Sequence, residues 1–312
     1  MKPSSVLRAL AAAGTLAGFG VAAWTLPVRH WRRFCTALAA TTEVAFAGAR
    51  RVEEKSLPPF MLELVGTSRR LAVRRFVAGF YEQHMQYLAV YRPGSWKPRF
   101  NYNGLEHIDA ALAAGRGAII WNSELIGASL MTKMALHQAG HRMTHLSRPG
   151  HGGSIMPFHV GRFAPLVTRA EKRFLRERIV IEDEKPEPAM RILLSRLKQN
   201  GVVSITVGMQ ARQIVRAPMF GGYLQIATGP ANLSRLSGAP LLPVFTVRRA
   251  SDEFDINIEA PLALHEDLPR EEALLAVATD YTALLESYVR RFPYVWAGWR
   301  TVGSWLPGDE AV

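Results

Sequence analysis

The sequence predicts an α/β protein: a single mostly parallel or mixed sheet flanked by helices, with an N-terminal helical extension that faces a membrane. Three observations lead to this fold class. Short apolar runs alternate with helical stretches between residues 100 and 260, which is typical of strands joined through helices. Residues before 100 show helical patterns instead. Of the 312 residues, 48% are hydrophobic, which is enough for a sizeable core.

The net charge narrows the choice of partners. The chain has 38 Lys and Arg against 26 Asp and Glu, a formal charge of +12, and many arginines are clustered. Such a surface attracts nucleic acid or anionic lipid, unless it is only solvated charge. Because we find no recognition helix, zinc ligands or aromatic RNA-binding strand, we expect anionic membrane lipids as partners and no nucleic acid. The one cysteine, Cys35, excludes an internal disulfide and a cysteine-rich metal site, and we expect no metal.

Residues 1–33 are the expected membrane anchor or docking segment. Ala9 to Leu26 is uncharged and mostly apolar, and Arg29, Arg32 and Arg33 follow it at once. Its length is close to the roughly 20 residues that span a bilayer, but Ala and Gly make it only weakly apolar. A membrane anchor, a cleaved signal peptide and an amphipathic docking helix all fit. We favour retention at the membrane, because the basic residues would hold anionic headgroups on the cytoplasmic side.

Residues 34–99 are predicted to be a helical extension. Phe34 to Lys55 is rich in Ala and predicts a helix, which ends before Pro58 and Pro59 because proline cannot continue a helix. Ser68 to Tyr91 carries aromatic residues at helical spacing. It therefore predicts a long amphipathic helix whose aromatic face belongs to the core.

An α/β domain is predicted over residues 100–305, followed by a tail at 306–312. It begins with a strand at Phe100–Tyr102, an Asn-Gly turn and a helix at Leu105–Ala114. Apolar or β-branched runs predict the later strands, and stretches with helical spacing predict the helices between them. In chain order we expect a strand at Met143–Ser147, a basic helix at Phe158–Arg178, a strand at Ile179–Ile181, a helix at Glu187–Asn200, a strand at Val202–Val207, a loop at Gly208–Arg216, a helix at Pro230–Leu236, a strand at Leu241–Arg248, an edge strand at Asp255–Ile258 and a helix at Glu271–Arg291.

One further strand ends in a polar cluster. Ala118 to Trp121 is an unbroken apolar run, typical of a strand buried on both faces, and Asn122, Ser123 and Glu124 follow it. Leu125 to Leu136 then looks helical. Open α/β folds bind ligands at the carboxyl edge of the sheet, so this cluster is a candidate site. The alternative is that Asn122 and Ser123 only cap the next helix.

Several segments occur in an order that is found in one known family. They are Asn101–His107 and Gly115–Ile120, then Met219–Gly222, Ala227–Ala231 and Ser237–Val244, and finally Arg291–Pro293 with Trp296, Trp299 and Arg300. This set resembles the bacterial lipid A lauroyl/myristoyl acyltransferase family, in the lysophospholipid acyltransferase-like superfamily, over roughly residues 70–305. The resemblance implies a membrane-associated enzyme that moves a fatty acyl group from an acyl thioester to a lipid or glycolipid hydroxyl. It also implies no bound cofactor, an acyl-carrier protein or coenzyme A thioester as co-substrate, and a place at the cytoplasmic face of the inner membrane.

The resemblance also implies a catalytic His followed, after four residues, by Asp or Glu. In that family the His removes a proton from the acceptor hydroxyl. Counted from Gly117, the His position falls on Glu124 and the acid position on Ser129, and none of the nine histidines has Asp or Glu five places later. Two hypotheses follow. Glu124 is the base, hydrogen-bonded by Ser129, Asn122 or Ser123. Alternatively, the site is catalytically inactive, and the protein binds lipid or scaffolds a membrane complex.

The first hypothesis depends on the proton affinity of Glu124. An ordinary Glu has a pKa about two units below that of His. Burial beside the apolar Trp121 is expected to raise the pKa of Glu124 and to recover part of that difference, because apolar surroundings disfavour a charged carboxylate.

Polar and basic residues that follow other strands are candidates for substrate binding. Arg148 follows the second strand, and Gln210 and Arg212 follow the third or fourth, so we expect their side chains to meet near Glu124 and to hold a phosphate or diphosphate. The alternative is that Arg148 and Arg212 are ordinary surface arginines. Arg216 is a weaker candidate of the same kind.

A histidine from another segment is an alternative source of the base. His145 and His151 are the best placed, although each also fits an ordinary structural histidine. Related sequences often carry an acidic residue where this chain has Gly208, so this site differs from the usual one at more than one position.

Overall fold

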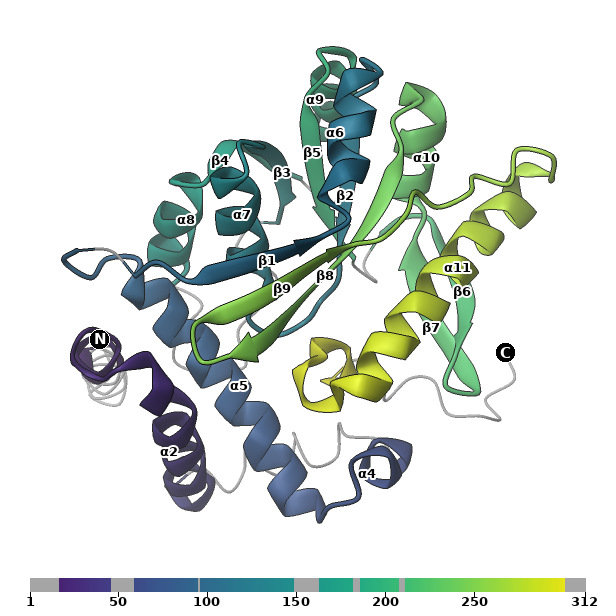
Figure 1. Ribbon diagram of the computed structural model, residues 1–312. Coiled ribbons are helices and arrows are strands. Elements are labelled where there is room, and N and C mark those ends of the chain that lie inside the picture. Colours follow the sequence, from purple (N-terminus) through teal and green to yellow (C-terminus); the bar gives the residue numbers. More distant parts are fainter. Residues whose placement is uncertain are drawn as a thin grey trace, which may run out of the picture.

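The predicted α/β fold is confirmed in the computed structural model, which describes residues 17–45, 59–94, 96–148, 163–181, 186–207 and 211–300 (Figure 1). The strands are β1 (Arg99–Asn103), β2 (Ala118–Asn122), β3 (Met143–Ser147), β4 (Leu175–Val180), β5 (Val202–Thr206), β6 (Ile214–Met219), β7 (Gly222–Ala227), β8 (Leu241–Ala250) and β9 (Glu253–Ile258). The α-helices are α2 (Trp31–Ala45), α4 (Pro59–Val65), α5 (Arg69–Ala89), α6 (Leu105–Ala113), α7 (Ala128–Gln138), α8 (Ala164–Lys172), α9 (Glu187–Lys198), α10 (Gly229–Ser237) and α11 (Arg270–Arg291). Short 3₁₀ helices are η1 (Val28–His30), η3 (Pro293–Val295) and η4 (Ala297–Arg300).

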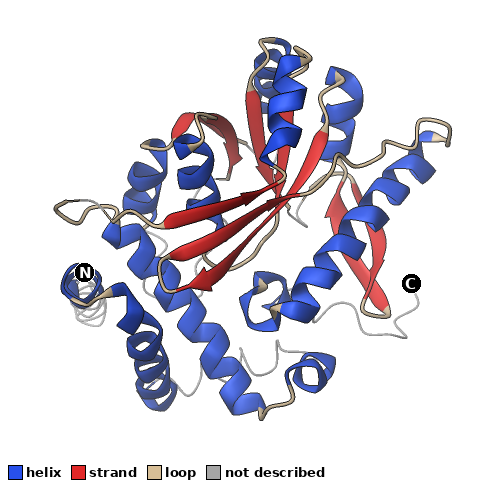
Figure 2. Ribbon diagram, in the orientation of Figure 1, coloured by secondary structure: helices blue, strands red, loops and turns tan. Residues whose placement is uncertain are grey.

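Seven strands form a mixed sheet in the order β1-β9-β8-β2-β5-β3-β4 (Figure 2). Strands β8, β2, β5, β3 and β4 run parallel to one another, whereas β9 is antiparallel to β8 and parallel to β1. The prediction that Asp255–Ile258 is an edge strand was wrong, because β1 pairs along its outer side. Side-chain amides support that pairing: Asn101 Nδ2 donates to Asp255 Oδ1 at 3.0 Å, and Asn103 Nδ2 donates to Asn257 Oδ1 at 2.8 Å.

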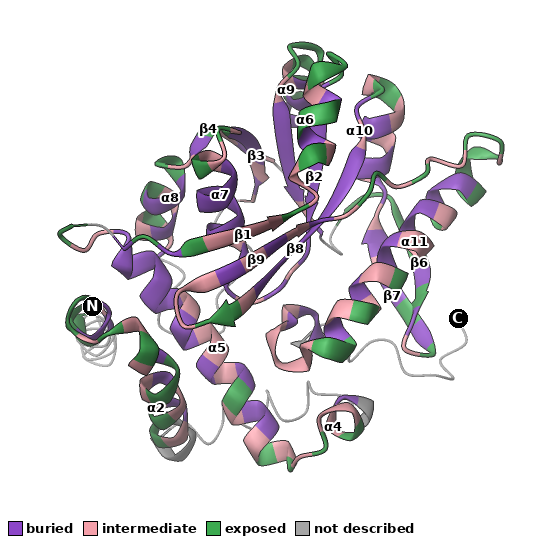
Figure 3. Cartoon of the chain, viewed as in Figure 1, coloured by how far each residue is buried: buried purple, intermediate pink, exposed green. Residues whose placement is uncertain are grey.

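Strand β2 lies inside the parallel part of the sheet and is buried on both faces, as predicted (Figure 3). Ala118 and Ile120 belong to one core cluster, together with residues of α6, α7 and α8. Ile119 and Trp121 belong to the other, together with residues of α9, α10 and α11. The polar residues that follow Trp121 therefore lie at the carboxyl edge of the sheet, between the helices that cover its two faces.

Two elements extend this core. Helix α5 crosses from one cluster to the other, since Ala78 and Met85 pack in the first and Val73 and Phe76 in the second. The hairpin β6–β7 is a separate two-stranded antiparallel sheet beside α11 (Figure 1).

The N-terminal residues pack along α5. Residues 17–25 are helical, with Phe19 and Ala23 buried, and the indole Nε1 of Trp24 donates to the carbonyl of Leu88 at 3.0 Å. Val21 and Trp24 remain 63% and 43% exposed. No helix among the described residues is long and apolar enough to cross a bilayer, and residues 9–16 of the predicted anchor lie outside that part of the chain. The division at residues 33, 99 and 305 stays a prediction.

Other elements differ from their predicted bounds. The helix predicted at Phe158–Arg178 is wrong in its second half: α8 ends at Lys172, and Arg176 and Arg178 lie on β4. An edge strand accommodates such charges, because alternate side chains reach solvent. Part of the predicted loop at Gly208–Arg216 belongs to β6, and α2 begins at Trp31 rather than Phe34.

A substitution at Gly104 tests how closely β9 and the start of α6 approach each other. Its φ is +82°, and an added Cβ would lie 1.9 Å from the carbonyl oxygen of Ile258, whereas Gly115 has φ +70° with open space around it. We expect Gly115→Ala to lower the free energy of unfolding by about 1 kcal/mol, the cost of the left-handed backbone. Gly104→Ala should cost roughly 3 kcal/mol or more, because a neighbouring backbone must also move. Urea unfolding of both variants measures the difference, and equal losses would contradict the close approach.

Candidate functional site

The loop between β2 and α7 is held by the C-terminal segment. The amide of Ile126 donates to the carbonyl of Val295 at 2.5 Å, and the amide of Ala297 donates to the carbonyl of Glu124 at 2.9 Å. The two segments therefore pair like short antiparallel strands, with Leu125 opposite Trp296. This pairing fixes the backbone on both sides of Glu124.

Aromatic packing stabilises the C-terminal segment itself. The rings of Trp296 and Trp299 lie 4.8 Å apart, edge to face, and both side chains are buried. Trp299 Nε1 donates to the carbonyl of Pro293 at 2.6 Å, and the ring of Phe220 at the tip of the β6–β7 hairpin lies 5.7 Å from that of Trp299. Three of the segments that carry the family resemblance thus meet around one loop.

Gly127 holds the other end of the loop. Its φ is +83°, its amide donates to Gln83 Oε1 of α5 at 2.7 Å, and a Cβ there would lie 3.2 Å from the amide group of Gln86. The predicted helix at Leu125–Leu136 therefore begins three residues later, at Ala128. Gly127 is its N-cap residue and no side chain caps it, so Asn122 and Ser123 are not capping residues.

Glu124 lies half-buried at the end of β2. Burial raises its pKa from 4.5 to about 7, which confirms the direction expected from its apolar surroundings. Tyr281 of α11 lies within electrostatic reach, because burial and then the negative charge of Glu124 raise the pKa of this tyrosine well above its ordinary value. The ring of Tyr281 packs on that of Trp121 at 4.2 Å. A carboxyl group with a pKa near 7 has the proton affinity that a general base needs at neutral pH.

Some polar atoms at or near the carboxyl end of β2 have no hydrogen-bond partner among the described residues. Asn122 Oδ1, Ser123 Oγ and the hydroxyl of Tyr281 are buried and make no hydrogen bond within the described part of the chain. An unpaired buried polar group costs about 1–3 kcal/mol, so nearly all such groups in proteins have a partner. Asn122 and Ser123 follow each other at the end of a buried strand, so their unpaired atoms make the carboxyl end of β2 a candidate ligand site.

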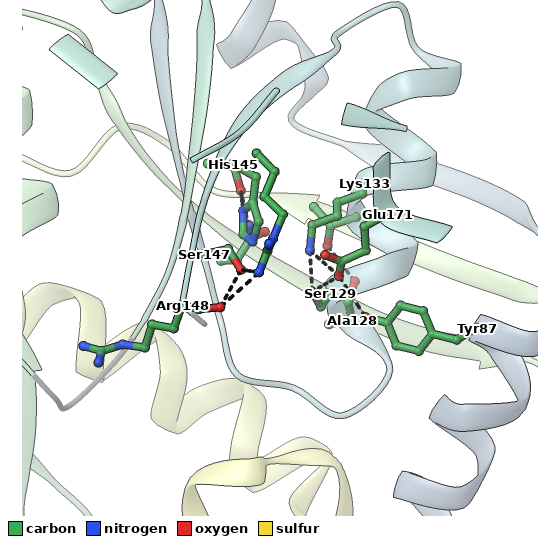
Figure 4. Close-up of polar contacts among 12 residues, drawn as sticks. Tyr87, Ala128, Ser129, Lys133, His145, Ser147, Arg148 and Glu171 are labelled. Atoms are coloured by element: carbon green, nitrogen blue, oxygen red, sulfur yellow. Dashed lines mark hydrogen bonds and ion pairs between the residues drawn. The ribbon is translucent and has the colours of Figure 1, made fainter. Parts of the chain in front are cut away.

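His145 belongs to a polar row across three strands rather than to a loop. It lies within β3, is 5% exposed, and its Nδ1 is 3.1 Å from Ser204 Oγ of β5 (Figure 4). Asn122 Nδ2 donates to the same Ser204 oxygen at 2.6 Å. His151 lies outside the described residues. Within the described ranges, no group of three or more His, Cys, Asp or Glu side chains is arranged to hold a metal.

Ser129 is part of a different buried cluster. Lys133 Nζ donates to Ser129 Oγ at 2.6 Å and to Glu171 Oε1 at 2.9 Å, and the hydroxyl of Tyr87 donates to the same Glu171 oxygen at 2.9 Å (Figure 4). The hydrogen bonds of the Ser129 side chain go to Lys133 and Glu171 and not to Glu124. The orienting role of Ser129 therefore stays a prediction without geometric support.

The predicted phosphate ligands do not form one cluster. Arg148 is half-buried and its side chain extends away from Ser147 and His145 (Figure 4). Arg212 is exposed and pairs with Glu187 of α9 at 3.3 Å. Arg216 is exposed on β6, and Gln210 lies outside the described residues. Their roles in substrate binding remain predictions.

Two residues of the site were missed in the sequence. Tyr281 lies on the apolar face of α11. A buried tyrosine hydroxyl normally needs a hydrogen-bond partner, so a tyrosine on this face was a sign in the sequence of a polar site nearby. Gln83 had no such signal, because its role depends on the loop that it meets across the fold.

A carboxyl group of raised pKa at the carboxyl edge of a mixed α/β sheet is typical of a ligand site in an enzyme. A comparison with protein families identifies the family to which the chain belongs. The model of the bacterial lipid A biosynthesis acyltransferases matches residues 6–298, so the chain belongs to that family, as the resemblance implied. These acyltransferases are membrane-associated and use acyl thioester donors. A search of curated proteins finds no match.

The burial of Glu124 predicts a pH-dependent stability. The folded pKa lies above the ordinary value, so the stabilisation by the protonated form is full below about pH 4.5 and is lost as pH rises through about 7. The free energy of unfolding of the wild type, minus that of Glu124→Gln, should therefore fall over this range. The fall is at most about 3 kcal/mol, and less where water screens the half-buried group. Urea unfolding of both proteins from pH 4 to 8 measures it, and a constant difference would show that Glu124 is not desolvated.

Proposed function

We propose that the protein transfers a fatty acyl group from an acyl-carrier protein or coenzyme A thioester to a hydroxyl of a lipid or glycolipid, with Glu124 as general base. The supporting observation is the half-buried Glu124, whose pKa of about 7 is near that of an ordinary His, at the position where the family is expected to carry one.

In this mechanism Glu124 accepts the proton of the acceptor hydroxyl as the oxygen attacks the thioester carbonyl. The C–O bond forms, the tetrahedral intermediate collapses, and the C–S bond breaks. The proton held by Glu124 then passes to the departing thiolate, so the carboxylate is regenerated. The hydroxyls of Ser123 and Tyr281 are buried donors without a hydrogen-bond partner among the described residues, and they are suited to stabilise the negative charge on the thioester oxygen.

The proposal includes attachment to the cytoplasmic face of the inner membrane. Val21 and Trp24 expose apolar surface beside the exposed arginines Arg29, Arg32 and Arg33. An apolar surface next to cationic side chains suits the interface of a bilayer with anionic headgroups. A lipid acceptor would then be delivered from the membrane itself.

The test of the base is acyl transfer by the purified chain, supplied with labelled acyl-coenzyme A or acyl-carrier protein and a bacterial lipid extract. We expect Glu124→Gln to lower the rate by about 10²–10⁴-fold, the usual contribution of a general base. Because the ionised form is the active one, kcat/KM should rise with pH and level off above about 7. Glu266→Gln removes an exposed loop carboxylate and is the matched control. An unchanged rate in Glu124→Gln would reject the assignment.

A second candidate is a catalytically inactive member of the family that binds lipid or scaffolds a membrane complex. The observation in its favour is that Ser129, at the acid position, is bonded to Lys133 and Glu171 instead of Glu124. The double variant Glu124→His/Ser129→Glu restores the expected motif. Acyl transfer by this variant but not by the wild type would support the inactive role, whereas transfer by the wild type would exclude it.

A further inference from the structure

A second polar cleft lies behind the loop that carries Glu124. Its walls are α2 and α5 on one side, β8 on the other, and Ile126 and Gly127 of the loop. Residues Thr246 to Arg248 of β8 line it, and they extend past the end of β2, whose pairing with β8 ends at Val244. The cleft therefore lies at the same carboxyl edge of the sheet as Glu124.

Arg248 presents an unused pair of donors in this cleft. Its Nη1 is paired with Glu82 Oε1 of α5, and the guanidinium lies over the ring of Phe254 at 5.4 Å. Its Nε and Nη2 are buried and make no hydrogen bond with any residue that the structure describes. The N–H groups of Nε and Nη2 lie along one edge of the planar guanidinium, and this edge matches two oxygens of a phosphate or carboxylate. Glu82 thus holds the guanidinium in place through Nη1 and leaves Nε and Nη2 without a hydrogen-bond partner among the described residues.

A buried acceptor lies in the same cleft. Gln86 is 3% exposed, and its Oε1 has no hydrogen-bond partner in the described part of the protein. Buried polar atoms that lack a protein partner normally bind water or a ligand. The cavity measures about 40 Å³, and one water needs roughly 10–15 Å³, so there is room for about three water-sized groups. That is about the space for the oxygens of one phosphate.

The charge of the cleft favours an anion. Glu82 neutralises Arg248, and both are largely buried, with 8% and 15% of their side chains exposed. Arg32 of α2 also lines the cleft and is exposed, so the cleft reaches the surface and carries one net positive charge. An incoming anion would meet Arg32 first and the fork of Arg248 next.

We propose that this cleft is a phosphate-binding site for a substrate, in which the Nε and Nη2 edge of Arg248 binds two phosphate oxygens and Gln86 Oε1 accepts a hydrogen bond from the same substrate. The inference rests on the proposed function, because the bound phosphate belongs to a substrate whose reacting group reaches Glu124 past Ile126 and Gly127. Arg148 and Arg212, the candidates from the sequence, do not line this cleft.

Two substrates of an acyl transfer carry a phosphate of this kind. One is the phosphopantetheine arm of the acyl donor, and the other is the headgroup of a phosphorylated lipid acceptor. In both, the phosphate oxygens are arranged tetrahedrally around phosphorus, so a guanidinium can bind either phosphate in the same geometry.

The test is calorimetric titration of the full chain with inorganic phosphate. We expect binding by the wild type and at least a tenfold loss in Arg248→Lys, which keeps the charge but lacks the fork. The double variant Glu82→Gln/Arg248→Met should lose it as well, without leaving a buried charge unpaired. Arg249→Gln is the matched control, since Arg249 is the next residue of β8 but is exposed and pairs with Asp255. No binding by the wild type, or equal binding by all variants, would overturn the proposal.

Two pairs of probes then identify the source of the phosphate. If 4′-phosphopantetheine binds and pantetheine does not, the site holds the acyl donor. If short-chain phosphatidic acid binds and the matching diacylglycerol does not, it holds the lipid acceptor. Binding of inorganic phosphate alone would show an adventitious ion site and reject a substrate role. Glu124→Gln should bind phosphate as the wild type does, so failure of this proposal and failure of Glu124 as base give different results.

Discussion

The pairing between the loop after β2 and the C-terminal segment is the interaction on which the rest of the site depends. A carboxyl group in apolar surroundings resists ionisation, and a free loop would move it into water. Here backbone hydrogen bonds on both sides of Glu124 hold the loop to residues 295–297, and Gln83 holds it at Gly127. The buried rings of Trp296 and Trp299 stabilise the segment that supplies these bonds. The burial of Glu124 therefore depends on contacts with segments that are far away in the sequence.

The same constraint explains how a glutamate can stand where a histidine is expected. The ordinary pKa of Glu lies about two units below that of His. Burial brings the pKa of Glu124 to about 7, so the environment supplies the proton affinity that an ordinary glutamate lacks. Where the resemblance implies a carboxylate, this chain has Ser129, whose hydroxyl accepts a hydrogen bond from the buried Lys133.

One loop separates two polar sites. Glu124 lies within electrostatic reach of Tyr281 on α11, whose ring packs on that of Trp121. Ile126 and Gly127 face the cleft of Arg248 on the α5 side. Buried ion pairs such as Glu82–Arg248 contribute little net stability, because desolvation of the two charges offsets their attraction. Their clearer effect is to fix side-chain positions. Here the pair leaves Nε and Nη2 of Arg248 without a hydrogen-bond partner in the described part of the chain.

The sequence by itself determined the α/β class, the buried strand Ala118–Trp121, most helices and the family, because hydrophobic periodicity and ordered segments are local properties. It also singled out Glu124 and the direction of its pKa shift. Only the tertiary structure decided the position of β9, the pairing of residues 124–126 with 295–297, the partners of Ser129, and the meeting of Glu82 with Arg248. These contacts join residues that are far apart in the chain; Glu82 and Arg248, for example, are 166 positions apart. Such meetings follow from how the layers pack, which no local pattern encodes.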